Sequence, residues 1–236
     1  MHQAVQRESK AARDSAGILD ASTLGKIDIQ GTDASEFLNR VYTNAWSKLE
    51  IGKCRYGLML NEDGMVYDDG VTTRLGENHY IMTTTTGGAA NVLSKLEDYL
   101  QTEWPELDVY LTSVTDHYAT VSISGPSSKK IISKIIPGLD LSDNKFPHMS
   151  FKNVVIDKIK CRVMRISFTG EPVFAPRKFN VNRSVIRKYN EVVADNASSA
   201  ANNTSVEIEE ESGGGDFTDV TKRHRVSSSG RFGPGS

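Results

Sequence analysis

Apolar residues follow two distinct periods along the first 171 residues, one typical of strands and one typical of helices. Where apolar and polar positions alternate between Gly, Asn and Asp turns, we predict strands. These segments are residues 26–30, 55–60, 65–75, 79–84, 109–113, 118–123, 152–157 and 162–168.

Helices are predicted where apolar residues recur every three or four positions. The clearest follows Gly88, where the apolar side of the helix carries Val92, Leu93, Leu96, Tyr99 and Leu100. Other helices are expected in the polar segment 3–16, after Gly31-Thr32-Asp33 and after Gly125-Pro126.

Thr32 and Asp33 stand immediately before the second of these helices. Either side chain can accept a hydrogen bond from a free N–H group in the first turn of a helix. We therefore expect one of them to be the N-cap acceptor.

A hairpin is expected around Asn61-Glu62-Asp63-Gly64, because Gly64 can adopt a positive φ between the predicted strands 55–60 and 65–75. A third strand at 79–84 would extend the hairpin into an antiparallel meander. Since hairpins and helices are interspersed, the order favours an α+β fold with a mixed or antiparallel sheet and packed helices, rather than a doubly wound α/β fold.

The pattern changes after residue 171. Ser, Gly, Asn, Glu and Arg replace the apolar clusters, and residues 196–236 have the composition of a flexible tail. We therefore expect a polar lead-in at 1–16, a folded domain at 17–171 and a mostly disordered tail at 172–236.

Charge and cysteine content exclude several functions. A net charge of −2 and a pI near 6.2 give no reason to expect nucleic acid or a membrane surface as a partner. The first residues lack the apolar segment of a secretory signal, so a cytoplasmic location is expected. Cys54 and Cys161 are far apart in sequence, without a CxxC or nearby His cluster, and no metal site is expected.

Asp68 and Asp69 are unusual because they are consecutive acids within a predicted strand. Successive strand side chains point to opposite faces, so one of the two carboxylates should face inward or line a cavity. A buried carboxylate is costly without a partner, which makes an inward acid a candidate for function. The alternative is that one acid caps the turn and the other lies at an exposed edge.

Four segments carry a resemblance to a known family: residues 17–31, 36–75, 80–116 and 162–171. Over residues 4–171 the chain resembles the aminomethyltransferase-like, folate-binding domain of sarcosine oxidase alpha subunits. It is more distantly similar to the aminomethyltransferase of the glycine cleavage system. The chain looks like a partial copy of that domain.

The resemblance implies roles for particular residues. In the family, the second acid of the Asp-Asp pair reaches the reactive nitrogens of tetrahydrofolate, and Asp69 stands at that position. A carboxylate there can take a proton or stabilise a cationic carbon. Tyr56 matches a tyrosine that lines the folate cavity, where a ring can contact the pterin. The alternative for Tyr56 is an ordinary core aromatic.

Glu171 belongs to the Thr169-Gly170-Glu171 motif and is a candidate folate-binding residue, or alternatively a turn residue. The family's pterin-binding glutamate lies four residues further on, where this chain has Ala175. Tetrahydrofolate is the implied cofactor, whereas the flavin and NAD of the family belong to regions that this chain lacks. Folate and other sarcosine oxidase subunits are the implied partners.

Two functions therefore compete. The first is a folate-dependent enzyme domain that passes the one-carbon unit from sarcosine oxidation to tetrahydrofolate. The second is a truncated or frame-shifted remnant without catalysis, or a folate-binding scaffold. Retained Asp69 and Tyr56 favour the first, and Ala175 favours the second.

Overall fold

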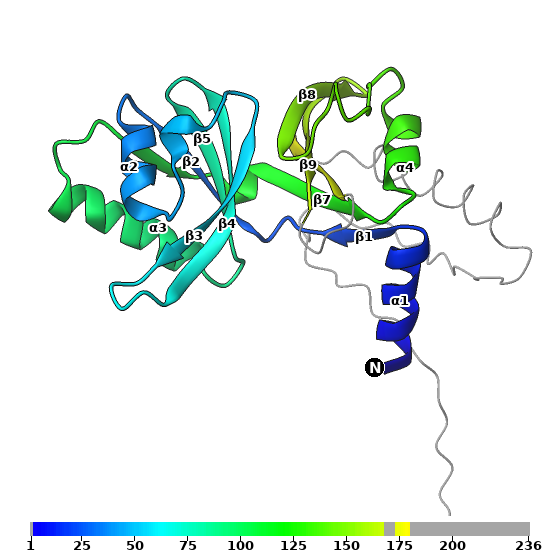
Figure 1. Ribbon diagram of the computed structural model, residues 1–236, viewed down its shortest axis with the longest axis horizontal. Helices are drawn as coiled ribbons and strands as arrows, with labels where there is room; N and C mark the ends of the chain where they lie inside the picture. Colours follow the sequence, from blue (N-terminus) through cyan, green and yellow to red (C-terminus); the bar gives the residue numbers. More distant parts are fainter. Residues whose placement is uncertain (1, 168–172, 180–236) are drawn as a thin grey trace, which may run out of the picture. The chain divides into compact units, whose positions relative to one another are not determined.

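Two five-stranded sheets make up the fold. The computed structural model describes residues 2–167 and 173–179 (Figure 1). Neighbouring strands are antiparallel in both sheets, so the fold is α+β with antiparallel sheets, as the sequence predicts. Sheet A has the order β1 (Gly17–Asp20), β7 (Tyr118–Ser124), β10 (Val173–Phe179), β9 (Ile159–Ile166) and β8 (Ser150–Ile156). Sheet B has the order β3 (Cys54–Leu60), β4 (Val66–Gly76), β5 (His79–Thr84), β2 (Gly25–Gln30) and β6 (Tyr110–Ser113).

Sheet B packs one face against helices α2 (Ala34–Val41) and α3 (Ala89–Asp98), which Figure 1 shows beside it. Each fully buried large apolar side chain stabilises such a core by about 1.5–3 kcal/mol. The buried members of this core are Ile27, Ile29, Ala34, Phe37, Leu38, Tyr42, Trp46, Leu49, Met59, Tyr80, Met82, Val92 and Leu96.

Short helical turns complete this part of the chain. They are η1 (Trp46–Lys48), the π-helical turn η2 (Tyr99–Glu103) that continues α3, and η3 (Thr115–His117). Because η2 directly follows α3, the helical pattern extends through Tyr99 and Leu100, as their spacing predicts.

Sheet A has its own core, which includes the apolar side of helix α4 (Ser128–Ile135). Ile131, Ile132 and Ile135 from this helix pack with Phe146 and Val163. Helix α1 (His2–Asp14) precedes β1, and its residues are mostly exposed, in agreement with the polar sequence of this segment.

The β3–β4 hairpin forms as predicted. Asn61 N–H bonds to the Met65 carbonyl at 2.8 Å, and Gly64 N–H bonds to the Asn61 carbonyl at 2.9 Å. Gly64 has φ +81°, a conformation that glycine adopts without the strain a side chain would cause. Strand β5 follows β4 in sheet B, so the meander is confirmed.

The expected N-cap of α2 is wrong. Neither Thr32 nor Asp33 caps the helix with a side-chain bond, because both side chains bond to Asp108 instead. Thr32 Oγ1 donates to the Asp108 carboxylate at 3.0 Å, and the Asp33 carboxylate accepts from Asp108 N–H at 2.9 Å. Asp108, which is 75 positions from Asp33, thus takes the hydrogen bonds that the first turn of the helix was expected to form.

Strand β10 continues sheet A beyond residue 171, where the sequence pattern suggested that the folded domain ends. It lies between β7 and β9, bonded to both. The rest of the expected tail, residue 172 and residues 180–236, is outside the described residues. Within the described ranges, no helix is long and apolar enough to span a membrane.

Candidate functional site

The two consecutive acids of β4 point to opposite faces of sheet B. Asp68 lies opposite Met59, which belongs to the helix-covered core, whereas Asp69 lies opposite Leu58. The alternation of strand side chains predicted this separation, and together with the resemblance it put Asp69 near Tyr56 in the folate cavity and Asp68 pointing away.

Asp68 is the buried acid, with 4% of its surface exposed. Its carboxylate accepts hydrogen bonds from Thr85 Oγ1 at 2.6 Å and from Thr85 N–H at 3.2 Å. Thr85 Oγ1 in turn accepts from Gly88 N–H at 3.1 Å, immediately before α3. Asp68 therefore ties β4 to the loop between β5 and α3, and its burial is compensated by these bonds.

Asp69 pairs with Tyr56. The Tyr56 hydroxyl donates a hydrogen bond of 2.7 Å to Asp69 Oδ2, across the β3–β4 hairpin. This bond, together with the negative charge of Asp69, raises the pKa of the Tyr56 hydroxyl above its usual range. The structure thus brings two of the sequence-predicted site residues into direct contact.

Tyr56 is 44% exposed, so it is not the core aromatic that the alternative interpretation required. Its main chain is held from the edge of the sheet, where Asn44 Nδ2 donates to the Tyr56 carbonyl at 2.5 Å. Thr43 N–H donates to the Leu58 carbonyl at 3.1 Å. Segment 42–44 therefore covers the outer edge of β3 and leaves the Tyr56 ring accessible.

Tyr42 lies in the core, where the charges of Asp68 and Asp69 affect its hydroxyl. It is 5% exposed and packs edge-on against Trp46, with ring centroids 5.9 Å apart. Burial, and then the negative charges of Asp68 and Asp69, raise the pKa of the Tyr42 hydroxyl well above its usual range. Tyr42 therefore stays neutral wherever the protein is folded near neutral pH.

The third predicted site residue, Glu171, lies outside the described residues. Ala175, at the position of the family's glutamate, is in β10 of sheet A, opposite Met164 of β9. Of the three predicted site residues, the structure therefore places Tyr56 and Asp69, both in sheet B and in contact with each other.

The structure adds Thr85 and Asn44 to the site, and neither was predicted. Asn44 is an isolated polar residue with no periodic signal. Thr85 belongs to the run Thr83-Thr84-Thr85-Thr86 at the end of β5, and such a run of hydroxyls was a detectable signal.

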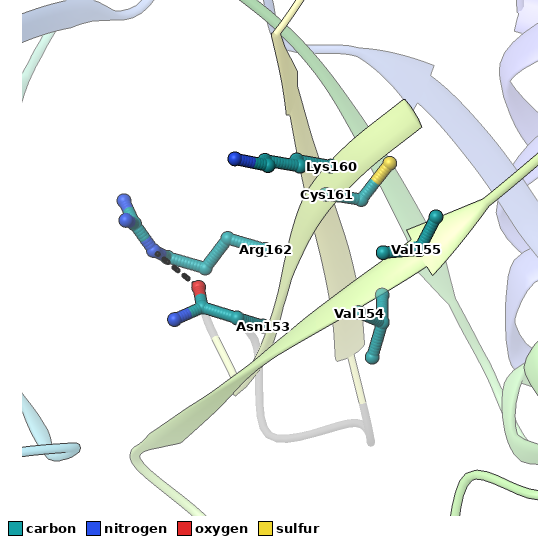
Figure 2. A pocket seen from close by; sticks show the side chains of 6 residues that line it. All are labelled: Asn153, Val154, Val155, Lys160, Cys161 and Arg162. Carbon is teal, nitrogen blue, oxygen red and sulfur yellow. Dashed lines mark hydrogen bonds between the residues drawn. The ribbon is translucent and has the colours of Figure 1, made fainter. Parts of the chain in front are cut away.

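A separate cavity of about 500 Å³ lies at the β8–β9 hairpin (Figure 2). Figure 2 shows Arg162 reaching Asn153, whose Oδ1 accepts from Arg162 Nε at 3.4 Å. The residues that line this cavity are Asn153, Val154, Val155, Lys160, Cys161 and Arg162. Neither Tyr56 nor Asp69 contributes to it. Among the described residues, no cluster of three His, Cys, Asp or Glu side chains could hold a metal ion.

Comparison with known proteins supplies the family. The family model described as "GCVT N-terminal domain" matches residues 1–175. The chain is 58% identical over 175 residues to sarcosine oxidase subunit alpha of Corynebacterium sp. (strain U-96), which covers 74% of this chain and 18% of that protein. It is 33% identical over 178 residues to the aminomethyltransferase of Thermoanaerobacter sp. (strain X514), which covers 74% of this chain and 46% of that protein. The chain thus spans about one fifth of the first relative's length and under half of the second's.

Solved structures share the fold. Aminomethyltransferase T of the glycine cleavage system from Bartonella henselae superimposes with a TM-score of 0.65 at 24% identity, over 78% of this chain and 48% of that one. A chain of the heterotetrameric sarcosine oxidase from Corynebacterium sp. U-96 superimposes with a TM-score of 0.53 at 14% identity, over 88% of this chain and 96% of that one. With the family model covering residues 1–175 and the two antiparallel sheets in place, the chain belongs to the GCVT N-terminal domain family.

Proposed function

We propose that this chain binds tetrahydrofolate at the Tyr56–Asp69 pair and promotes transfer of a one-carbon unit to it, as part of a sarcosine oxidase alpha-type protein. The observation that carries the proposal is the 2.7 Å hydrogen bond between the Tyr56 hydroxyl and Asp69 Oδ2. This bond orients the Asp69 carboxylate, which is only partly buried. Asp68, the residue before it on β4, is held by a hydrogen bond from Thr85.

The two side chains suit a folate chemically. The exposed ring of Tyr56 offers an aromatic surface to a flat pterin. Asp69 offers a carboxylate that accepts hydrogen bonds from ring N–H groups and attracts positive charge.

In the reaction, tetrahydrofolate would supply two nucleophilic nitrogens that bond to a carbon at the oxidation level of formaldehyde, whose oxygen leaves as water with the two N–H protons. Asp69 can accept a proton at Oδ1 while Oδ2 keeps the Tyr56 hydrogen bond. A fixed carboxylate lowers the barrier as a general base when it takes a proton, or electrostatically while it is ionised and faces a developing cation. Asp69 is therefore the proposed catalytic residue, and Tyr56 and Glu171 are the proposed folate-binding residues.

Ala175 favours a second function, that of a non-catalytic remnant or a folate-binding scaffold. By resemblance, position 175 is where a glutamate grips the pterin, and alanine cannot make that contact. Losing a hydrogen bond to a charged group removes about 1.5–3 kcal/mol. This corresponds to a decrease in affinity of roughly tenfold or more.

The proposal also assigns partners, the place of other cofactors and a location. Other sarcosine oxidase subunits are proposed as partners, because the solved sarcosine oxidase is named as heterotetrameric. Flavin and NAD are proposed to belong to regions of the relatives that this chain does not span, and the proposed location is the cytoplasm.

Calorimetric titration of tetrahydrofolate into the full chain tests the proposal. We expect wild-type binding to weaken by roughly tenfold in Asp69→Asn, since a charge-assisted contact is worth more than 1.4 kcal/mol. Glu62→Gln is the matched control, because Glu62 is an exposed acid in the turn of the same hairpin, and its affinity should equal wild type. Ala175→Glu should bind more tightly.

Each outcome separates the two functions. Binding that is unchanged in Asp69→Asn would place the site elsewhere, and absence of binding in every variant would favour the remnant. If binding occurs, the rate at which tetrahydrofolate takes up formaldehyde should exceed the uncatalysed rate with wild type but not with Asp69→Asn. A scaffold would bind without this acceleration.

A further inference from the structure

The regular backbone pairing of strand β4 with β5 ends next to Asp69, although the two strands stay in close contact. Backbone pairing between the two strands includes Arg74 opposite Tyr80, Thr73 opposite Ile81 and Thr72 opposite Met82. At the next residue, Val71, a side chain replaces the backbone of β5 as the hydrogen-bond partner. Thr83 Oγ1 accepts from Val71 N–H at 2.8 Å and donates to the Val71 carbonyl at 3.0 Å. One threonine hydroxyl therefore satisfies both backbone groups of Val71.

This arrangement requires a glycine at position 70. A Cβ atom on Gly70 would lie 1.8 Å from the Thr83 carbonyl oxygen, far inside any allowed contact. The absence of a side chain lets the two backbones approach closely enough for the Thr83 hydroxyl to reach Val71. The two strands are thus closely packed where their regular pairing ends, with Thr83 only 6% exposed.

On the other side of Asp69, Asp68 is held by Thr85 through two hydrogen bonds. Asp69 thus lies between two anchors, both provided by the threonine run that ends β5. Its partner in the sheet is Leu58 of β3. The direction of the Asp69 side chain therefore depends on these anchors and on the β3–β4 pairing.

We propose that Thr83 and Thr85 are positioning residues that hold the Asp69 carboxylate against the Tyr56 hydroxyl. This inference rests on the proposed function for its significance, but its geometry does not depend on a bound ligand. A catalytic carboxylate must be held within about 0.5 Å of its working position by surrounding bonds, and hydroxyls from a neighbouring strand provide such support. Neither threonine contacts the substrate in this scheme.

The test uses valine and serine substitutions in the full chain. Thr83→Val and Thr85→Val remove each hydroxyl and keep the branched shape, whereas Thr83→Ser keeps the hydroxyl. Thr86→Val is the matched control: Thr86 is an exposed member of the same run, and its hydroxyl contacts Thr23 rather than β4.

The readout is the alkaline titration of Tyr56, followed by tyrosinate absorbance and isolated by subtracting the same variant carrying Tyr56→Phe. Thr83→Ser and Thr86→Val should titrate as wild type. Thr83→Val and Thr85→Val should titrate at lower pH, shifted toward the midpoint of Asp69→Asn, in which the charged acceptor is gone. A purely structural role would lower stability in urea without moving this midpoint.

A wild-type midpoint in folded Thr83→Val and Thr85→Val would overturn the inference. If Thr83→Val does not fold, Thr85→Val decides, because Thr85 is exposed. Failure of wild type to bind tetrahydrofolate would refute the proposed function and leave the Tyr56 titration as an independent test of the positioning. The two failures are therefore distinguishable.

Discussion

Replacing Gly70 by alanine should destabilise the protein through a contact that the structure defines closely. The added Cβ would lie 1.8 Å from the Thr83 carbonyl oxygen, whereas real Cβ contacts essentially never fall below 3.0 Å. The strands must therefore separate by about 1.2 Å, the difference between these two distances. Such a movement breaks the bonds of 2.8 and 3.0 Å between Thr83 Oγ1 and Val71.

The magnitude follows from these two effects. Forcing an extra carbon into a packed interior costs about 1–3 kcal/mol. Each of the two lost hydrogen bonds adds about 0.5–1.5 kcal/mol. We therefore expect Gly70→Ala to lower the free energy of unfolding by about 2–6 kcal/mol. For a chain of this size, that corresponds to a decrease in Tm of at least about 4 °C.

Urea denaturation of Gly70→Ala, wild type and Gly87→Ala measures this effect. Gly87 is the matched control, because a Cβ there would meet no atom within 4 Å and its φ is not positive. Its free energy of unfolding should stay within about 0.5 kcal/mol of wild type. A loss below about 1 kcal/mol in Gly70→Ala would show that β4 and β5 do not pack as closely as described, since overpacking alone should exceed it.

Three further predictions concern the core and the titrating groups. Phe37→Ala should lower the free energy of unfolding in urea by about 3–5 kcal/mol, because Phe37 is fully buried, whereas exposed Val66→Ala should change it by less than about 0.5 kcal/mol. The raised pKa of Tyr42 contributes stability that is present below the ordinary tyrosine pKa of about 10 and is lost as pH rises through the folded-state value. Above about pH 10, the free energy of unfolding in urea should therefore fall less with pH in Tyr42→Phe than in wild type. Hydrogen bonds and charges from Arg165 and then Lys129 lower the pKa of Asp143, so the stability that this carboxylate contributes is present above about pH 4 and lost on acidification. The free energy of unfolding of Asp143→Asn, measured in urea between about pH 5 and 2, should therefore depend less on pH than that of wild type. An equal pH dependence in the two proteins would refute this pairing.

Local patterns predicted the elements of this fold because their causes are local. The spacing of Val92 and Leu96 defines α3, and the Asn61–Gly64 turn fixes the hairpin register. The predicted N-cap of α2 was wrong because its cause is not local: Asp108 bonds to Thr32 and Asp33 from a distant part of the chain.

For the candidate site, the sequence by itself determined that Asp68 and Asp69 point to opposite faces, because strand side chains alternate. It could not determine which face is covered by helices, since that depends on where α2 and α3 pack. Only the tertiary structure decided that Asp68 is buried against Thr85 and that Asp69 meets Tyr56. Those contacts join residues 13 and 17 positions apart, at distances set by how β3, β4 and the end of β5 assemble.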